Sequence, residues 1–213
     1  MAKQFRGVSR LYFATITEGD SSTTYGTPIQ IEGVKAITRE INSENEDVWA
    51  DNKLYQKTYA GTSVTRSFET VRLDPAIEAQ LLGQTTVQVR AAASQVTAIN
   101  AYATPADASN RPYFAFGYAL HDGNVEDPCE IVWAYKGIVN SISKSANTID
   151  AGTGSDGQTI NLTFIAPKFK FTTTNQHNLD LALPVTSEIT VASWFSEVIT
   201  PDNVASKMAP ASL

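Results

Sequence analysis

One glycine-rich segment of the sequence matches a nucleotide-binding pattern. Residues 152–157, GTGSDG, have the spacing G-x-G-x-x-G, in which a tight turn after a strand brings a pyrophosphate to the N-terminus of a helix. That chemistry requires a helix after the glycines. The residues that follow, QTINLTF, alternate between polar and apolar as a strand does. We therefore interpret 152–157 as the turn of a hairpin.

A second segment has the spacing of carboxylate ligands in a calcium loop. Asp122, Asn124 and Glu126 alternate as such ligands do. Asp127, however, stands where the loop needs glycine, and Trp133 stands where the closing bidentate carboxylate belongs. A turn is the better interpretation.

The histidines and the single cysteine form no catalytic or metal-binding pattern. His121 and His177 are far apart in sequence, and one acid near each falls short of the three or four ligands that zinc needs, so we expect solvated surface histidines. Cys129 follows a proline in a turn, and no serine lies in a G-x-S-x-G elbow. We therefore predict no enzyme activity, no cofactor and no metal.

Composition indicates a folded, acidic protein. The 213 residues are 42% hydrophobic and 18% charged, with a formal net charge of −6. Tight binding of nucleic acid requires clustered Lys and Arg, so this charge argues against it. One cysteine allows no internal disulfide, and neither a leader nor an apolar run of about 20 residues is evident. We expect a soluble, unsecreted chain made in a reducing compartment.

One short helix is bracketed by capping residues. Asp74 is a good N-cap, Pro75 suits the first helical position, and Gly83 suits a left-handed C-terminal residue. We expect the stripe that contains Leu81 to pack on a sheet, and Glu78 to face away.

Most of the remaining chain is typical of strands. Apolar alternation and β-branched or aromatic residues predict strands at 11–16, 29–41, 113–120, 131–149 and 159–164. Residues 85–110 are harder to interpret, and we expect a strand followed by a surface excursion. Strands joined by turns, without long helices, predict a mainly β protein, an antiparallel β-sandwich or barrel with one short flanking α-helix.

A long segment without strand periodicity separates the second strand from the helix region. Residues 42–60 mix acids and aromatics, as interface segments do, and we expect a contact loop or protruding hairpin. The alternatives are a hairpin folded back on its own core and a solvated acidic loop. The candidate assembly contacts here are Glu44, Glu46, Asp47, Trp49, Asp51, Tyr55 and Tyr59.

The chain beyond residue 171 changes in character. We divide it into a β-sandwich domain, 1–171, and a C-terminal arm, 172–213. Val191, Trp194, Phe195 and Val198 have the spacing of an amphipathic helix that begins near Ser187. Trp194 and Phe195 are further candidate assembly contacts, and we expect the arm to dock on its own sandwich or on a neighbouring subunit.

A series of motifs, taken in order, resembles a known family. The sequence resembles the major tail (tail tube) proteins of long-tailed, non-contractile bacteriophages over roughly residues 8–199, most weakly at 84–110, where this chain is expanded. The motifs are YGTP at 25–28, ADN at 50–52, LLG at 81–83, PYFAFGY at 112–118, VWAYKG at 132–137 and WF at 194–195.

The resemblance implies a structural virion protein made in the host cytoplasm. Subunits of such proteins form hexameric rings that stack into a tube, through which the genome is ejected, and they are related to the tube protein of type VI secretion systems. The implied partners are other copies of the chain, the tape measure protein, the tail terminator and distal tail proteins, with no membrane. DNA would pass through the lumen without specific binding, which suits the negative net charge. A monomeric β-sandwich binding or adhesion module is the alternative.

Overall fold

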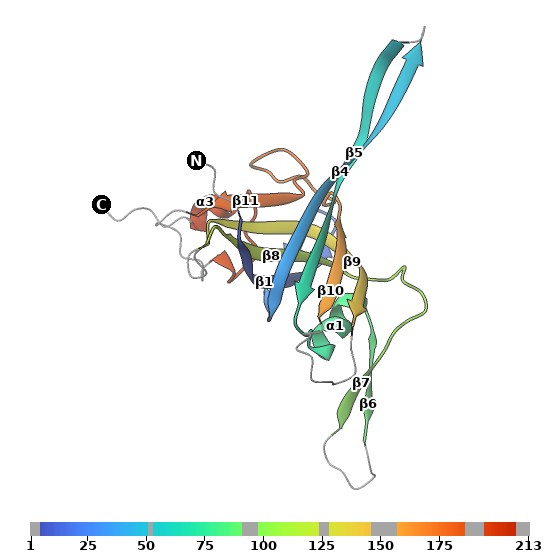
Figure 1. Ribbon diagram of the computed structural model, residues 1–213, viewed down its shortest axis with the longest axis vertical. Coiled ribbons are helices and arrows are strands. Elements are labelled where there is room, and N and C mark those ends of the chain that lie inside the picture. Colours follow the sequence, from blue (N-terminus) through green and yellow to red (C-terminus); the bar gives the residue numbers. More distant parts are fainter. Residues whose placement is uncertain are drawn as a thin grey trace, which may run out of the picture.

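Figure 1 shows a computed structural model of the chain, which is mainly β. The structure describes residues 5–50, 53–90, 98–123, 128–145, 157–185 and 194–207, with side chains described outside 44–60. The elements are β1 (Gly7–Glu18), β2 (Thr23–Tyr25), β3 (Ile29–Ile31), β4 (Val34–Ala50), β5 (Lys53–Thr70), α1 (Pro75–Leu82), β6 (Thr85–Val89), β7 (Ile99–Ala103), β8 (Tyr113–His121), β9 (Glu130–Lys144), β10 (Gln158–Phe164), β11 (Asp180–Pro184) and α3 (Val204–Lys207).

The nine strands of the main sheet are antiparallel, and they fold over into a sandwich. Their order is β2-β1-β8-β9-β10-β5-β4, with β3 also paired to β1 and β11 also paired to β9. Strand β9 carries register shifts opposite both β8 and β10, and such irregularities let one strand contribute to two packed layers. The predicted antiparallel β-sandwich is confirmed.

The first core lies between the two layers of the sandwich and is rich in phenylalanine. Phe116 lies at its centre, with ring centroids 6.0 Å from both Phe68 and Phe164. Phe13 packs edge-on against Phe114 at 5.5 Å. All five rings are fully buried, so their apolar surface contributes strongly to the stability of the sandwich.

The second core lies on the opposite face of β1, β8 and β9. Small residues of β8, such as Ala115 and Ala119, leave room there for Trp133. Trp194 and Phe195 close this core from the C-terminal side. Both faces of β8 are therefore buried, which explains its nearly continuous apolar sequence.

Helix α1 is capped as predicted. The side chain of Asp74 accepts a hydrogen bond from the backbone N–H of Ala76, and Gly83 is left-handed with φ 64°. Leu81 is fully buried in the first core. The expectation that Glu78 faces away is wrong, because Glu78 is 9% exposed and lies 2.5 Å from the Nζ of Lys144.

The segment from 42 to 60 is strand wherever the structure describes it. Strands β4 and β5 pair from Val34↔Thr70 to Ala50↔Lys53 and run out from the sandwich in Figure 1. Of the two forms expected, a contact loop and a protruding hairpin, the backbone pairing corresponds to the hairpin. Beyond the sandwich no core imposes apolar alternation, so backbone pairing leaves no periodic trace in the sequence.

Two other expectations at the ends of elements need correction. The first strand is longer than 11–16, because β1 covers Gly7–Glu18. Of the predicted C-terminal helix, Trp194 is helical, but the helix does not continue through Phe195, which lies in a turn, or Val198, which lies in irregular structure. Its expected beginning, 187–193, lies outside the described residues. The short helix α3 follows instead and was not predicted.

Candidate assembly surfaces

Strands β9, β10, β5 and β4 present a polar face away from the first core. In β10, Ile160, Leu162 and Phe164 are buried, while the residues between them are partly exposed. The same alternation holds in β5. The face is formed by short polar residues and two carboxylates: Thr38, Glu40, Asn42, Thr65, Ser67, Glu69, Asn140, Ser141, Thr159, Asn161 and Thr163.

Cross-strand hydrogen bonds hold this polar face flat. Asn140 Nδ2 donates to Thr163 Oγ1 at 2.8 Å, and Asn161 Nδ2 donates to Ser141 Oγ at 3.1 Å. Asn42 Nδ2 reaches Thr65 Oγ1 at 3.4 Å. The amides and hydroxyls thus satisfy one another across neighbouring strands, leaving a rigid surface of low charge.

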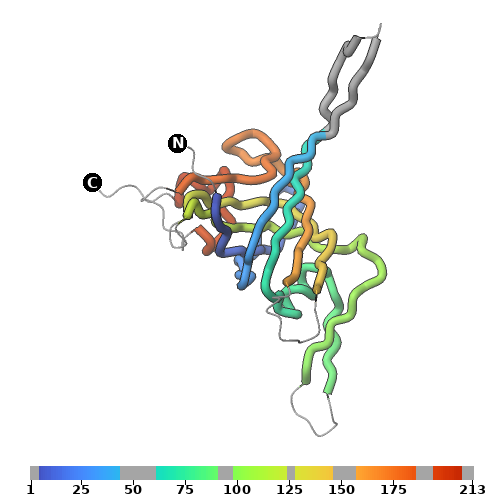
Figure 2. Tube along the Cα trace, in the orientation of Figure 1, coloured from blue at the N-terminus to red at the C-terminus, as the bar shows by residue number. Residues whose placement is uncertain are grey.

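Strand β4 lies at one end of the strand order, which makes it an edge strand. It is 17 residues long, and its free edge carries a row of backbone N–H and C=O groups. Such an edge is a template for pairing with another chain. Figure 2 shows the part of β4 that borders the sandwich, at one side of the sheet.

An ion cluster around the buried Arg66 joins the two layers of the sandwich beside β4. Arg66, whose side chain is fully buried, pairs with Asp180, and Arg39 Nη2 lies 2.9 Å from the same carboxylate oxygen. Arg66 Nε also donates to Tyr118 Oη at 3.2 Å, and its guanidinium carbon lies 4.6 Å from the ring centroid of Phe164. The cluster pins β11 to β5 and β4.

An open cleft of about 290 Å³ lies next to this ion cluster. It is bounded by β4, β8, β9 and β11, and its lining is largely apolar. The lining residues are Phe5, Ile37, Arg39, Tyr118, Leu120, Glu130, Val132, Asp180 and Ala182. We call it the β11 cleft.

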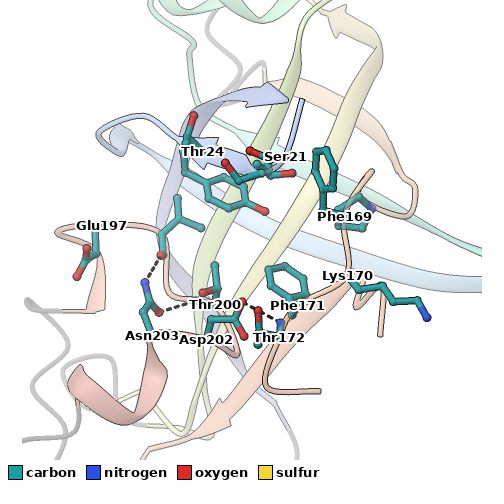
Figure 3. Close-up of a pocket in the computed structure, with 15 residues that line it drawn as sticks. Ser21, Thr24, Phe169, Lys170, Phe171, Thr172, Glu197, Thr200, Asp202 and Asn203 are labelled. Carbon is teal, nitrogen blue, oxygen red and sulfur yellow. Dashed lines mark hydrogen bonds between the residues drawn. The ribbon is translucent and has the colours of Figure 1, made fainter. Parts of the chain in front are cut away.

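A second cavity, of about 520 Å³, lies where the β1–β2 turn meets the C-terminal segment. Figure 3 shows Ser21, Thr24, Phe171 and Asp202 around it. Burial alone would raise the pKa of Asp202, but the backbone N–H groups of Thr173 and Thr172 donate to its carboxylate and lower that pKa. The carboxylate therefore serves as a local clamp.

A similar clamp lies at the end of β1. Partial burial by itself would raise the pKa of Glu18, but Lys136 Nζ, 2.6 Å away, and the backbone N–H of Lys168 lower it. Lys136 Nζ also lies 4.8 Å from the ring centroid of Tyr113. These contacts fix the loop after β10 against β1 and β9.

The predicted assembly contacts fall into two groups. Glu44, Glu46, Asp47 and Trp49 lie in β4, Tyr55 and Tyr59 lie in β5, and Asp51 lies outside the described residues. Trp194 and Phe195 lie instead in the second core of the same chain, where they are 3% and 5% exposed. The first group belongs to the β4–β5 hairpin, whereas the rings of Trp194 and Phe195 face the interior of their own chain.

Of the two histidines, His177 is exposed as expected, whereas His121 is not. His121 is only 4% exposed, and its Nε2 lies 2.6 Å from Ser9 Oγ, so the expectation of a solvated side chain is wrong for it. His177 Nδ1 lies 2.9 Å from the carbonyl oxygen of Pro167. Cys129 Sγ donates to the carbonyl oxygen of Leu120.

The chemical patterns in the sequence find no catalytic context here. Gly157 leads into strand β10, so the helix that a dinucleotide site needs is absent from this position, while 152–156 lie outside the described residues. Asn124, Glu126 and Asp127 also lie outside them. In the described ranges, no group of three His, Cys, Asp or Glu side chains could hold a metal ion. No helix in the same ranges is long and apolar enough to cross a membrane.

Sequence reasoning missed Arg66, Asp180 and the polar face. A signal for Arg66 was present, because it interrupts the buried alternation of Val64 and Phe68. A charged residue at such a position implies a buried partner. Nothing in the sequence marks Asp180 as that partner, since 114 positions separate the two.

No family model matches the chain, and no curated protein sequence matches it. Among solved structures, the chain is similar to the anti-feeding prophage (AFP) tube terminating cap, with a TM-score of 0.44 and 10% identity over 87% of this chain and 95% of that chain. It is similar to a chain of the AFP baseplate, with a TM-score of 0.38 and 6% identity over 82% and 93%. It is also similar to the tail of an empty gene transfer agent particle, with a TM-score of 0.35 and 15% identity over 72% and 89%. TM-scores below 0.5 do not establish a common fold.

Proposed function

We propose that this chain is a structural tail-tube protein, which assembles as stacked hexameric rings into a conduit for DNA. The observation that carries the proposal is the polar face of β9, β10, β5 and β4. It combines hydroxyls, amides and two exposed carboxylates, Glu40 and Glu69, on a rigid sheet. The family resemblance in the sequence points to the same function.

We assign this polar face to the wall of the lumen. Duplex DNA carries about one charge per 1.7 Å of helix axis, so a basic wall would bind it along its whole length. Short polar side chains satisfied by their neighbours offer DNA few contacts, and Glu40 and Glu69 repel it. DNA would slide past such a wall without being held.

The contacts between subunits are assigned to the projecting hairpin and the sheet edge. The β4–β5 hairpin extends beyond the sandwich and carries Trp49, Tyr55 and Tyr59, and the free edge of β4 can pair with a neighbouring chain. Roles for Trp194 and Phe195 between subunits, and an independent arm at 172–213, remain predictions. Within the chain, β11 is already a strand of the main sheet.

Electron microscopy of the purified protein tests the proposal directly. We expect the purified protein to form hexameric rings or tubes at high concentration. In the virion, we expect the tail to contain also the tape measure protein, the tail terminator and distal tail proteins. Unmodified protein that stays monomeric at every concentration would overturn the proposal.

The 520 Å³ cavity favours a second candidate function, a monomeric β-sandwich binding module. Its lining combines hydroxyls with aromatic rings, including Tyr25 and Phe171, as sites for neutral polar ligands do. The hydroxyl of Tyr25 is buried without a hydrogen-bond partner in the part of the chain that the structure describes. Titration with a panel of mono- and oligosaccharides, followed by NMR, separates this function from assembly.

A further inference from the structure

The β6–β7 hairpin is a two-stranded sheet separate from the main one. Its register pairs Val87 with Ala101 and Val89 with Ile99, and directly paired residues lie on the same face of a sheet. One face of the hairpin is therefore apolar. The residues between them, including Gln88 and its partner Asn100, form a polar face.

The apolar face of this hairpin is uncovered. Val87 is 48% exposed, Val89 is 49% exposed and Ile99 is 65% exposed. The hairpin meets the body near α1, and a hydrogen bond from Gln84 Nε2 to Thr104 Oγ1 closes its base at 2.8 Å. Figure 2 shows it extending from the sandwich. Two-stranded hairpins are only marginally stable in water, so we expect this face to pack on another surface.

The β11 cleft offers an apolar surface of matching character. Ile37, Leu120 and Val132 line its floor, and Ala182 lies exposed at its wall. Strands β4, β8, β9 and β11 bound the cleft, whereas the β6–β7 hairpin extends away from the sandwich beyond α1 (Figure 1). The hairpin therefore cannot fill the cleft of its own chain, but a second copy can supply one.

The charges at the two surfaces are also complementary. Arg90 is exposed and lies just beyond the end of β6, where the alternation of side chains between the two faces no longer fixes its direction. Glu130 lies in the cleft, where burial raises the pKa of its carboxyl. The negative charge of Asp180 also raises this pKa, whereas the positive charge of Arg39 lowers it. A guanidinium from another copy would offset the burial of that carboxylate.

We propose that the apolar face of the β6–β7 hairpin packs into the β11 cleft of a neighbouring copy, with Arg90 directed to Glu130. The contact joins two different surfaces, so it is heterologous and can repeat along a ring or a tube. It deepens the proposed self-assembly and rests on it. It also gives a role to the part of the chain where the family resemblance is weakest.

Cysteine cross-linking tests the contact itself. In a Cys129→Ser background, Val89→Cys combined with Ala182→Cys brings two thiols together only between copies. Under mild oxidation of the assembled protein we expect a ladder of disulfide-linked oligomers on a non-reducing gel. Pairing Val89→Cys with Thr38→Cys, on the polar face, is the matched control and should give no ladder.

Substitutions on the two faces of the hairpin test its energetic role. Val87→Ser, Val89→Ser and Ile99→Ser together should raise the protein concentration needed for assembly at least tenfold, without changing the unfolding midpoint of the monomer. The matched control, Gln88→Ser with Asn100→Ser on the polar face, should assemble like the unmodified chain.

A charge exchange completes the test. Arg90→Glu or Glu130→Arg alone should weaken assembly, and the two together should restore it. Normal assembly by the apolar-face variant, or the absence of a ladder from assembled Val89→Cys/Ala182→Cys protein, would overturn the hairpin contact alone. Unmodified protein that remains monomeric would overturn the proposed function as well.

Discussion

Close packing between a glycine and an aromatic ring fixes the spacing of β8 and β9. A Cβ atom added at Gly117 would lie 2.8 Å from ring atoms of Trp133. The ring cannot move aside easily, because it is fully buried and its Nε1 donates to the carbonyl oxygen of Trp194 at 3.2 Å. The strand pattern alone does not explain why a glycine lies at position 117. The close approach of the Trp133 ring does, because it leaves no room for a side chain there.

At this position, Gly117→Ala should destabilise the monomer by about 1–3 kcal/mol, as overpacking does in dense cores. Gly61→Ala is the control, because a Cβ atom added at Gly61 would meet nothing within 4 Å. Chemical denaturation of both variants measures the difference. Equal unfolding free energies would contradict the packing argument.

The buried Arg66–Asp180 pair leads to a second prediction. Asp180→Ala leaves the fully buried Arg66 side chain without its carboxylate and should cost about 3–5 kcal/mol. Arg66→Met combined with Asp180→Ala should recover most of that loss, since no buried charge remains. Lys207→Ala breaks a pair with Glu197 whose side chains are 40% and 44% exposed, and should cost less than about 1 kcal/mol. A double variant as unstable as Asp180→Ala would refute this account.

Among the elements, the β4–β5 hairpin offers the clearest way to test assembly without affecting folding. Ser43 and Thr62 are directly paired, so residues 44–61 can be replaced by an Asn-Gly turn without changing register. All core residues among the described side chains lie outside this segment. We expect a monomer with an unchanged unfolding midpoint that forms no tubes, as judged by circular dichroism and electron microscopy. Normal tubes from the shortened chain would exclude the hairpin as a contact.

The C-terminal segment covers the second core from the same chain. Phe195 stacks on Tyr12 with a centroid distance of 4.7 Å and is 5% exposed. Phe195→Ala should therefore destabilise the isolated monomer by about 3–5 kcal/mol. Phe5→Ala is a matched control, because Phe5 is 59% exposed and its loss should cost about 0.5 kcal/mol or less. A defect seen only in assembly, with normal monomer stability, would instead indicate docking between subunits.

At the scale of the whole molecule, the polar face, the sheet edge and two projecting hairpins surround two compact cores. Under the proposed function, this arrangement leaves one broad surface for DNA and others for neighbouring copies. The charge on the DNA-facing surface should then affect passage of the genome rather than folding.

We expect phage particles built with Glu40→Lys, or with Glu69→Lys, to have intact tubes but slower genome ejection. The defect should ease as salt rises, because the Debye length is about 10 Å at 0.1 M and shorter above it. Asp20→Lys, in the β1–β2 turn, makes the same charge change away from this face and is the control. Normal ejection by the Lys variants at low salt, or retardation of duplex DNA by the unmodified protein, would count against the conduit.

The sequence by itself determined the elements whose signals are local. Asp74 and Gly83 bracket α1 because caps act within one turn, and alternation in β10 and β8 marks strands that pack on a core. These signals sufficed for the mainly β class and the sandwich. Only the tertiary structure decided which distant residues meet: the pairing of Arg66 with Asp180, the burial of His121 beside Ser9, and the inward position of Phe195.

The hairpins show the same division. The β4–β5 extension and the β6–β7 hairpin are held by backbone pairing beyond the cores, where side chains need not follow the period of a buried face. The sequence therefore carries little trace of the first, and it shows Val87 and Val89 without saying that their face is uncovered. Strand order and exposure arise from contacts between residues far apart in the chain, which local patterns do not encode.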